Sequence, residues 1–438
     1  MRLYFQHDAP TVGAVPEFYS HLPIIVDYSS PILWDATALR RMKSALRFPD
    51  RVVGISIKGS YRNVVKVSNA LDLSFPALES LGLQEMDSFR PDILLTMPFK
   101  TSIRSLRRLQ LDGASPISSE ILSVTTSLID LTLNTTILTC LMSIFPHLQR
   151  MPHLRNLEVS SRVVLPLHDE MPHTMATLPE LTHFRISDGC SDIEWLVAGL
   201  VSPSLLELDI LLYDEEDDES RTRILGPNLS EFIRAAGIVF FAARLSILPH
   251  TFKTSLYARP LSINGPPSKI VTIETVSLAR PHIASSPMLA TVEDIFLSLP
   301  DPTESNISLL QNPLREFFNE FRNVKVLRLH HDLETIAADM LGQPTANPLP
   351  AGEELDPDAT TRTSQVTLDI FPSLEEIVVH ARTPDMSIDG MESASLLGSF
   401  GPFVAARDQV GRPVKVFRDA DGKVPDYFTM DSQTSRMD

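Results

Sequence analysis

The chain is poor in the residues that build several common kinds of site. Only two cysteines, Cys140 and Cys190, occur in 438 residues, which argues against a disulfide framework and a cysteine-based zinc site. Glycine is sparse, at 17 residues, and neither of the glycine-rich phosphate loops, G-x-G-x-x-G and G-x-x-x-x-G-K-[ST], is present. The longest apolar run, 238–243, is far shorter than the roughly 20 residues that span a bilayer. The sequence therefore favours neither a nucleotide-binding enzyme nor a membrane protein.

Positive charge is also scarce. Lys and Arg total 38 against 55 Asp and Glu, for a formal net charge of −17. A nucleic-acid partner or an anionic membrane is not expected, because binding to phosphates rests on Lys and Arg. Residues 1–8 contain no apolar stretch long enough for a signal peptide. We therefore expect a cytoplasmic or nuclear protein.

A six-residue phrase, Leu-x-x-Leu-x-Leu or a close variant, recurs along the chain. Its clearest copies begin at Leu106, Leu128, Leu154, Leu181 and Leu205, so the spacings are 22, 26, 27 and 24 residues. This period is typical of a leucine-rich repeat, in which each copy adds one strand to a stack. We therefore predict an α/β fold, an irregular leucine-rich-repeat solenoid with a curved sheet on the concave side and helices and loops on the convex side. Such an array usually presents a recognition surface.

The repeats predict a single array over residues 1–418. The phrase fades across about 211–290, where strands are expected to replace helices, and it returns in three later copies that begin at Val292, Val324 and Leu374. Between the last two copies, residues 343–364 are rich in Pro, Thr, Asp and Glu and predict a mobile insertion. Residues 419–438 predict a disordered tail.

Further elements are expected around the repeats. A strand at 24–28, a helix from about Asp35 to Pro49 and a strand at 52–57 form the first strand–helix–strand unit. Later helices are expected at 191–200 and from Asn312 onward, where capping residues precede an apolar stripe.

The last predicted elements close the array. A final helix is expected at 402–409, with Gly411 as its C-cap, and a strand at 413–417.

No motif for catalysis or metal binding stands out. His330-His331-Asp332 is the densest candidate cluster, but adjacent residues of a strand point to opposite faces, so the two imidazoles are not expected to share an ion. The acidic loop 213–220 lacks the alternating ligands and glycine turn of a calcium-binding EF-hand loop. We therefore predict no catalytic residue, no cofactor and no metal, and a protein that is not an enzyme.

The residues between the leucines are the candidates for partner binding. In each Leu-x-x-Leu-x-Leu strand the leucines point into the solenoid and the intervening residues point outward, because side chains alternate along a strand. Their mixture of charges and amides suits a protein partner, and simple solvation is the alternative. The candidates are Arg108, Gln110, Asp130, Asn156, Glu158, His183, Arg185, Glu207, Asp209, Arg328 and His330.

Three stretches resemble the leucine-rich-repeat proteins of mushroom-forming fungi that are known as F-box proteins. They are 151–159, 318–329, and 403–407 with 411–414. The last stretch is the most specific, because repeat geometry alone does not require it. The resemblance spans roughly residues 20–418. It implies that the repeats hold a substrate while an N-terminal F-box docks on the Skp adaptor of a cullin ubiquitin ligase.

The chain departs from this family at its N-terminal side. Its early Leu22-Pro23 leads into a predicted strand, where an F-box would have a helix. A Skp-type adaptor is therefore expected only if an F-box lies upstream. The leading hypothesis is substrate recognition in a ubiquitin ligase, and the alternative is a free-standing leucine-rich-repeat scaffold with no ligase link.

Overall fold

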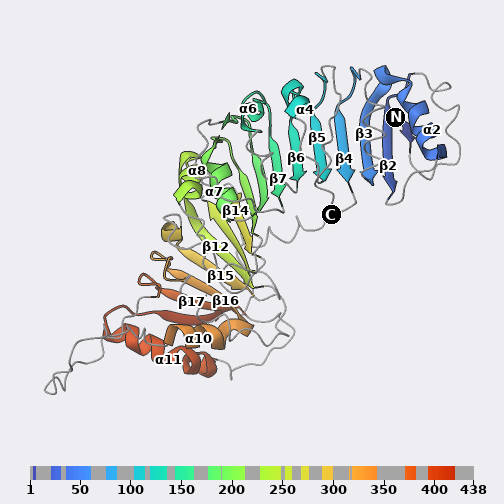
Figure 1. The fold of residues 1–438 in the computed structure, drawn as a ribbon. Helices are drawn as coiled ribbons and strands as arrows, with labels where there is room; N and C mark the ends of the chain where they lie inside the picture. The colour runs from blue at the N-terminus through green and yellow to red at the C-terminus, as the bar shows by residue number, and fades with distance from the viewer. Residues whose placement is uncertain are drawn as a thin grey trace, which may run out of the picture. The chain divides into compact units, whose positions relative to one another are not determined.

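Figure 1 shows the computed structural model of the chain. The chain divides into two compact units. Unit 1 comprises Met1–Ile210 with Glu231–Gly237, and unit 2 comprises Leu211–Ser230 with Ile238–Asp438. The structure describes residues 3–5, 21–30, 36–60, 75–85, 103–113, 119–135, 144–161, 176–188, 190–212, 227–247, 252–258, 268–275, 289–298, 315, 318–342, 370–380 and 393–419. No helix among these residues is long and apolar enough to cross a membrane.

Unit 1 is built on a sheet whose strands follow the repeats. The pairs from β1–β2 to β7–β9 run parallel. The strand order is β1 (Leu3–Phe5), β2 (Ile24–Ser30), β3 (Val52–Gly59), β4 (Ser80–Glu85), β5 (Arg108–Gly113), β6 (Asp130–Thr135), β7 (Asn156–Ser161), β9 (His183–Asp188) and β11 (Glu207–Leu212), the last of which begins in unit 1.

The leucines of successive repeats stack in register. Leu109 pairs with Leu131, Leu131 with Leu157, and Leu157 with Phe184. Each of these side chains is at most 2% exposed. Full burial of such a side chain contributes about 1.5–3 kcal/mol, so the stacked row is a main source of the stability of unit 1. The leucine phrase therefore forms the core of an α/β leucine-rich-repeat fold, as predicted.

A short turn precedes each strand and explains the apolar–proline pairs of the sequence. The amide of Leu78 donates to the carbonyl of Phe75, and that of Leu154 donates to the carbonyl of Met151, both at 3.2 Å. Phe75 and Met151 are buried. The proline between each pair has no amide hydrogen to lose, so the turn tolerates it.

Backbone hydrogen bonds also tie each repeat to the one before it. The amides of Ile129 and Asp130 both donate to the carbonyl of Arg107, at 2.8 and 2.9 Å. One repeat later, the amides of Arg155 and Asn156 both donate to the carbonyl of Ile129, at 2.8 and 3.0 Å. One carbonyl thus accepts hydrogen bonds from two successive amides of the next repeat, and this pair of bonds sets the spacing between neighbouring strands wherever the phrase occurs.

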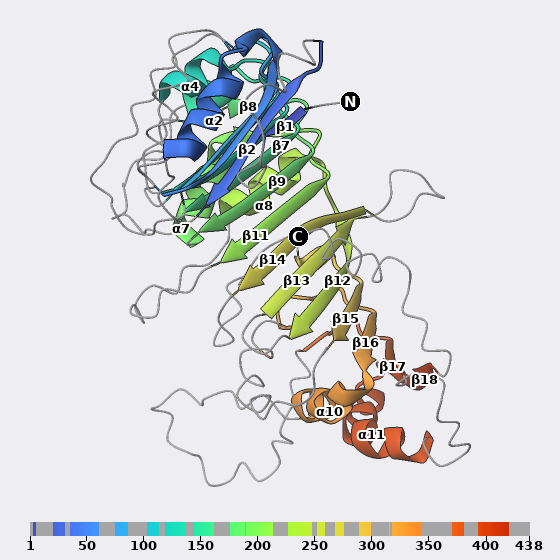
Figure 2. The same cartoon turned by 90° about the vertical axis from the view of Figure 1, so that its right-hand side faces the viewer.

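The helices of unit 1 connect its strands. In Figure 2, α2, α4 and α7 lie on the same side of the strands of this unit. Gly199 packs against the buried ring of Phe145, where a Cβ atom would come within 2.7 Å of the ring. The helices are α2 (Ala36–Leu46), η1 (Pro49–Arg51), α4 (Ser119–Val124), α6 (Phe145–Leu148) and α7 (Cys190–Ala198). The strands β8 (Ala176–Thr177) and β10 (Leu200–Val201) form a separate parallel pair. The helix α8 (Pro227–Ala235) begins in unit 2 and ends in unit 1.

Unit 2 combines a parallel array with an antiparallel meander. β12, β15, β16, β17 and β18 are parallel neighbours, whereas β13 runs antiparallel to both β12 and β14. The order is β14 (Ser268–Thr275), β13 (Phe252–Ala258), β12 (Phe240–Ile247), β15 (Asp294–Ser298), β16 (Val326–His330), β17 (Glu376–His380) and β18 (Lys415–Asp419), with η3 (Leu289–Thr291), η4 (His331–Leu333), α10 (Glu334–Gly342) and α11 (Ser393–Gln409) between or beside them.

A buried arginine joins α11 to the turn before β17. Arg407 is only 1% exposed, and its guanidinium donates to the carbonyls of Phe371, Pro372 and Leu374 at 3.5, 3.3 and 2.8 Å. Phe371 has a φ of 50°, an uncommon conformation for a bulky residue. Burial lowers the pKa of Arg407, and the charge of Arg412 lowers it further.

Most predicted elements are present. In the section 211–290, where strands are expected to replace helices, the helix α8 is present beside the strands. Three further corrections concern the bounds of elements. The helix predicted at 191–200 ends at Ala198, and Leu200 belongs to β10. The helix predicted to start at Pro402 begins at Ser393 and contains Pro402. The closing strand lies at Lys415–Asp419 and so includes the first residue of the predicted tail.

Some predictions concern residues outside the described part of the chain. The insertion at 343–364, the remainder of the tail and most of the helix expected from Asn312 lie there. The single array over 1–418 stays a prediction.

Candidate protein-interaction surface

The candidate residues lie on the side of each strand opposite the leucines. In β11 and β16 the burial alternates residue by residue, with the leucine side buried and the other side half-buried. Along unit 1, Arg108, His183 and Arg185 are exposed, and the acidic candidates Asp130 and Glu158 are half-buried. We call the outward-facing side of the unit 1 strands the open face.

The candidates on the open face pair with one another across neighbouring strands. Arg108 Nε lies 2.9 Å from Asp130 Oδ2. The side-chain amide of Asn156 donates to the other carboxylate oxygen of Asp130. Residues from β5, β6 and β7 therefore form one continuous polar row, because the parallel register places them side by side.

A second polar group lies on β7, β9 and β11. Arg185 Nε is 3.9 Å from Glu158 Oε1, and His183 Nε2 is 3.7 Å from Glu207 Oε2. These distances are long and the side chains are one-third to three-fifths exposed, so solvent screens both pairs. Each pair can open for a partner at a small energetic cost.

Seven of the eleven candidates line a single hollow of about 310 Å³ on the open face. Its lining also includes Leu131, Leu157 and Phe184, whose side chains are buried on the other side of the strands. The seven are Asp130, Asn156, Glu158, His183, Arg185, Glu207 and Asp209. We call this concavity the acidic hollow.

The acidic hollow has a negative formal charge. Four lining carboxylates against the single guanidinium of Arg185 give −3, with His183 taken as neutral. Adding Arg108, which pairs with Asp130, leaves −2. The arginines of the described residues therefore do not neutralise the hollow.

A second hollow, of about 430 Å³, adjoins the first strands of unit 1. Its lining includes Gly54, Ser56 and Glu79 together with Arg108 and Asp130. Asp130 thus borders both hollows, and the polar row crosses the space between them.

The candidate residues of unit 2 are more enclosed. Arg328 Nε contacts both carboxylate oxygens of Asp294, at 3.0 and 2.9 Å, and its side chain is 21% exposed. Asp294 is buried. Arg328 therefore has a partner within the unit, and His330 belongs to the cluster described next.

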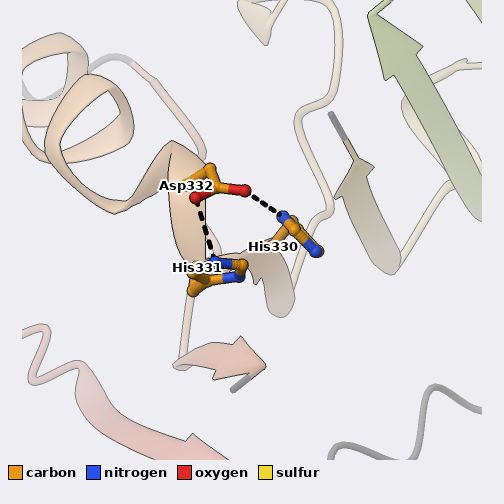
Figure 3. A group of neighbouring side chains, drawn as sticks. All are labelled: His330, His331 and Asp332. Atoms are coloured by element: carbon orange, nitrogen blue, oxygen red, sulfur yellow. Dashed lines mark ion pairs between the residues drawn. The ribbon is translucent and has the colours of Figure 1, made fainter. Parts of the chain in front are cut away.

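The expectation that His330 and His331 point to opposite faces is wrong. β16 ends at His330, and η4 begins at His331, so the chain no longer alternates as a strand. His330 Nδ1 lies 3.2 Å from Asp332 Oδ2, and His331 Nε2 lies 2.9 Å from Asp332 Oδ1 (Figure 3). The two rings lie 4.3 Å apart between centroids.

The sequence reading missed several polar residues of the same surfaces. His153 Nδ1 lies 2.9 Å from Glu180 Oε1, and Arg155 Nε lies 3.4 Å from Glu180 Oε2, in the turns before β7 and β9. The hydrogen bond from His153 lowers the pKa of Glu180, and Arg155 contributes in the same direction. The signal was present in the sequence as charges recurring just before the strands.

Comparisons with known proteins add little to this geometry. No protein-family model and no curated protein matches the sequence. Among solved structures, the leucine-rich-repeat-containing protein LegL7 from Legionella pneumophila is similar at 12% identity and a TM-score of 0.28, with 91% of this chain and 97% of that chain covered. The Rad7 and Elc1 complex in yeast is similar at 13% identity and a TM-score of 0.28, with 87% and 71% covered.

The fold assignment rests on the molecule itself. Parallel strands recur at the spacing of the leucine phrase, and the leucines stack in register. These features define the fold as a leucine-rich-repeat type of strand stack.

Proposed function

We propose that the open face of unit 1 binds a positively charged segment of a protein partner. The observation that carries the proposal is the acidic hollow, in which four carboxylates face one guanidinium. The hollow also contains the amide of Asn156 and the imidazole of His183 between its charges. Such a mixture of charged and hydrogen-bonding groups suits a protein segment, whose backbone and side chains supply both kinds of contact.

The ion pairs of the open face favour a Lys or Arg ligand. Glu207 lies 3.7 Å from His183, and Glu158 lies 3.9 Å from Arg185, so neither of these two contacts is at charge-assisted hydrogen-bond distance. Asp209 lies in the same hollow. A lysine or arginine brought between these carboxylates gains closer, charge-assisted hydrogen bonds, whereas an acidic segment is repelled.

The finer proposal concerns the complex in which this binding takes place. From the sequence resemblance, we propose substrate recognition by an F-box-type protein in a ubiquitin ligase of the cytoplasm or nucleus, with a Skp-type adaptor if an F-box lies upstream. The alternative is a non-catalytic scaffold without a ligase link. The two differ in one outcome, because only the first predicts that the adaptor is recovered and that partner abundance rises when the protein is removed.

Affinity purification of the full chain tests both the proposed binding surface and the proposed ligase context. The doubly charge-reversed variant Glu207→Lys/Asp209→Lys should lose the partner that the wild-type chain recovers. Glu231→Lys is a matched control, because Glu231 lies exposed on α8 and outside the hollow. Equal recovery by all three proteins would contradict the proposed surface. Recovery of a partner without the adaptor would support the alternative hypothesis, a scaffold without a ligase link.

A further inference from the structure

The His330–Asp332 cluster lies where β16 turns into α10. His330 ends the strand with extended backbone angles, φ −66° and ψ 141°, and the 3₁₀ turn of η4 follows immediately. A 3₁₀ turn has about three residues per turn, so it curls the chain back within two residues. Asp332 is thereby placed against both preceding imidazoles, as Figure 3 shows.

The ligand atoms of the cluster lie at the separations that a small cation needs. One atom from each of the three residues lies within 4.8 Å of the other two. The two nitrogen–oxygen separations are 3.2 and 2.9 Å. Zinc–ligand bonds of about 2.05 Å in a tetrahedron place neighbouring ligand atoms roughly 3.4 Å apart. Small side-chain rotations would therefore suffice to seat an ion.

Buried polar atoms of the cluster lack hydrogen bonds. Both ring nitrogens of His331 and the Oδ2 atom of Asp332 are buried without a hydrogen-bond partner among the described residues. The 2.9 Å contact from His331 Nε2 to Asp332 Oδ1 is an ion-pair distance without hydrogen-bond direction. A buried polar atom left without a hydrogen bond destabilises the folded state. Coordination would use these lone pairs.

The charges around the cluster also favour a dication. Two arginine–carboxylate pairs flank it, Arg328 with Asp294 and Arg418 with Glu334. Asp332 lies in the cluster itself, and Asp419 lies 3.4 Å from the imidazole of His380, which pairs in register with His330. Over these six side chains, four carboxylates against two guanidiniums give a formal charge of −2, which a divalent cation offsets.

We propose that His330, His331 and Asp332 bind a borderline divalent cation of the Zn²⁺ class. Two imidazoles and one carboxylate match the ligands of zinc, whereas Ca²⁺ and Mg²⁺ select oxygen ligands. Three protein ligands leave a fourth position for water or for a partner side chain. The site lies in unit 2, whereas the acidic hollow lies in unit 1. The cation site and the proposed recognition of a basic segment can therefore be tested independently.

Titration of the purified full chain with Co²⁺ or Zn²⁺ tests the site. The wild type should bind one equivalent, and bound Co²⁺ should show the visible absorption of a low-coordinate ion. Asp332→Asn keeps the side-chain shape and should weaken binding at least about tenfold, as should His331→Ala. The control His153→Ala removes an exposed histidine of unit 1 and should leave binding unchanged.

The unfolding temperature of each metal-free variant shows whether a loss of binding comes from loss of the site or from loss of the fold. Zn²⁺ should raise the unfolding temperature of the wild type but not that of Asp332→Asn, because only a native site stabilises the folded state. Absence of binding in the wild type would overturn the proposal. Equal binding by Asp332→Asn and the wild type would place the cation elsewhere and overturn it too.

Discussion

Units 1 and 2 use polar residues in opposite ways. In unit 1 the charges lie on the open face and are paired across strands, as with the exposed Arg108 and the half-buried Asp130. In unit 2 polar groups are buried within the fold, as with Arg407 and His380, which are 1% and 2% exposed. A regular leucine stack needs no polar group to hold it, so its surface residues are available for recognition. The irregular unit depends on single polar contacts.

The largest effect is expected at Arg407. Arg407→Met removes the donors to three carbonyls of the turn before β17 and should lower the free energy of unfolding by about 3 kcal/mol. Arg412→Met is the matched control, because Arg412 is exposed and makes one long bond, at 3.4 Å, to Pro372. Chemical denaturation measures both. Equal losses would show that burial of Arg407 has no special role.

Gly199 probes a close contact in unit 1. A Cβ atom there would lie 2.7 Å from Phe145 Cε1, so Gly199→Ala should destabilise the protein by about 1–3 kcal/mol. Gly82→Ala on β4 meets nothing closer than 3.8 Å and should be nearly neutral. Thermal unfolding compares the two. An unchanged unfolding temperature in Gly199→Ala would mean that the ring of Phe145 shifts to make room for the added methyl group.

Acid should weaken the region around His380 in unit 2. Burial lowers the pKa of His380 below its ordinary value of 6.5, and Arg328 and His330 lower it further, although Asp419 opposes them. The unfolded chain then binds the proton more readily, so the stabilisation is present above about pH 6.5 and is lost as pH falls through the folded-state pKa.

Hydrogen exchange of β17 between about pH 8 and pH 5 should report this loss, and His380→Gln should flatten the dependence. His147 in unit 1 shifts in the same direction through burial and Arg150, so His147→Gln should act on α6 and not on β17. The same pH dependence of β17 in His380→Gln and in the wild type would contradict the assignment.

The smallest effect on stability is expected on the open face. The side chains of Arg185 and Glu158 are 59% and 43% exposed and lie 3.9 Å apart, so Arg185→Gln should change the free energy of unfolding by less than about 0.5 kcal/mol. Arg328→Gln, which breaks the enclosed pair with Asp294, should cost more. Denaturation of both variants sharpens the contrast between the units. Equal effects would remove it.

The sequence predicts the part of the fold that repeats. Leu109, Leu131 and Leu157 stack because the same phrase recurs at a nearly constant spacing. Residues 252–258, which form β13, carry no leucine phrase, and their antiparallel pairing with β12 follows from contacts distant in sequence. Single-sequence patterns do not contain that information.

The candidate surface was predictable in outline only. Alternation along each strand placed Glu158 and Arg185 on the same face, but their ion pair depends on which repeat adjoins which. The geometry of His330 and His331 was mispredicted because the strand ends at His330, and a one-residue difference in the end of a strand reverses where a side chain points. Ends of elements are the least certain part of a sequence reading.

Selection from a random peptide library against the purified chain tests the proposed recognition most directly. The wild-type chain should enrich peptides rich in Lys and Arg, and Glu207→Lys/Asp209→Lys should lose that enrichment by about tenfold or more, since like charges then face each other. The control Glu231→Lys should select as the wild type does. Peptides without a charge preference, or the same basic peptides bound by the doubly reversed variant, would contradict a role for the acidic hollow.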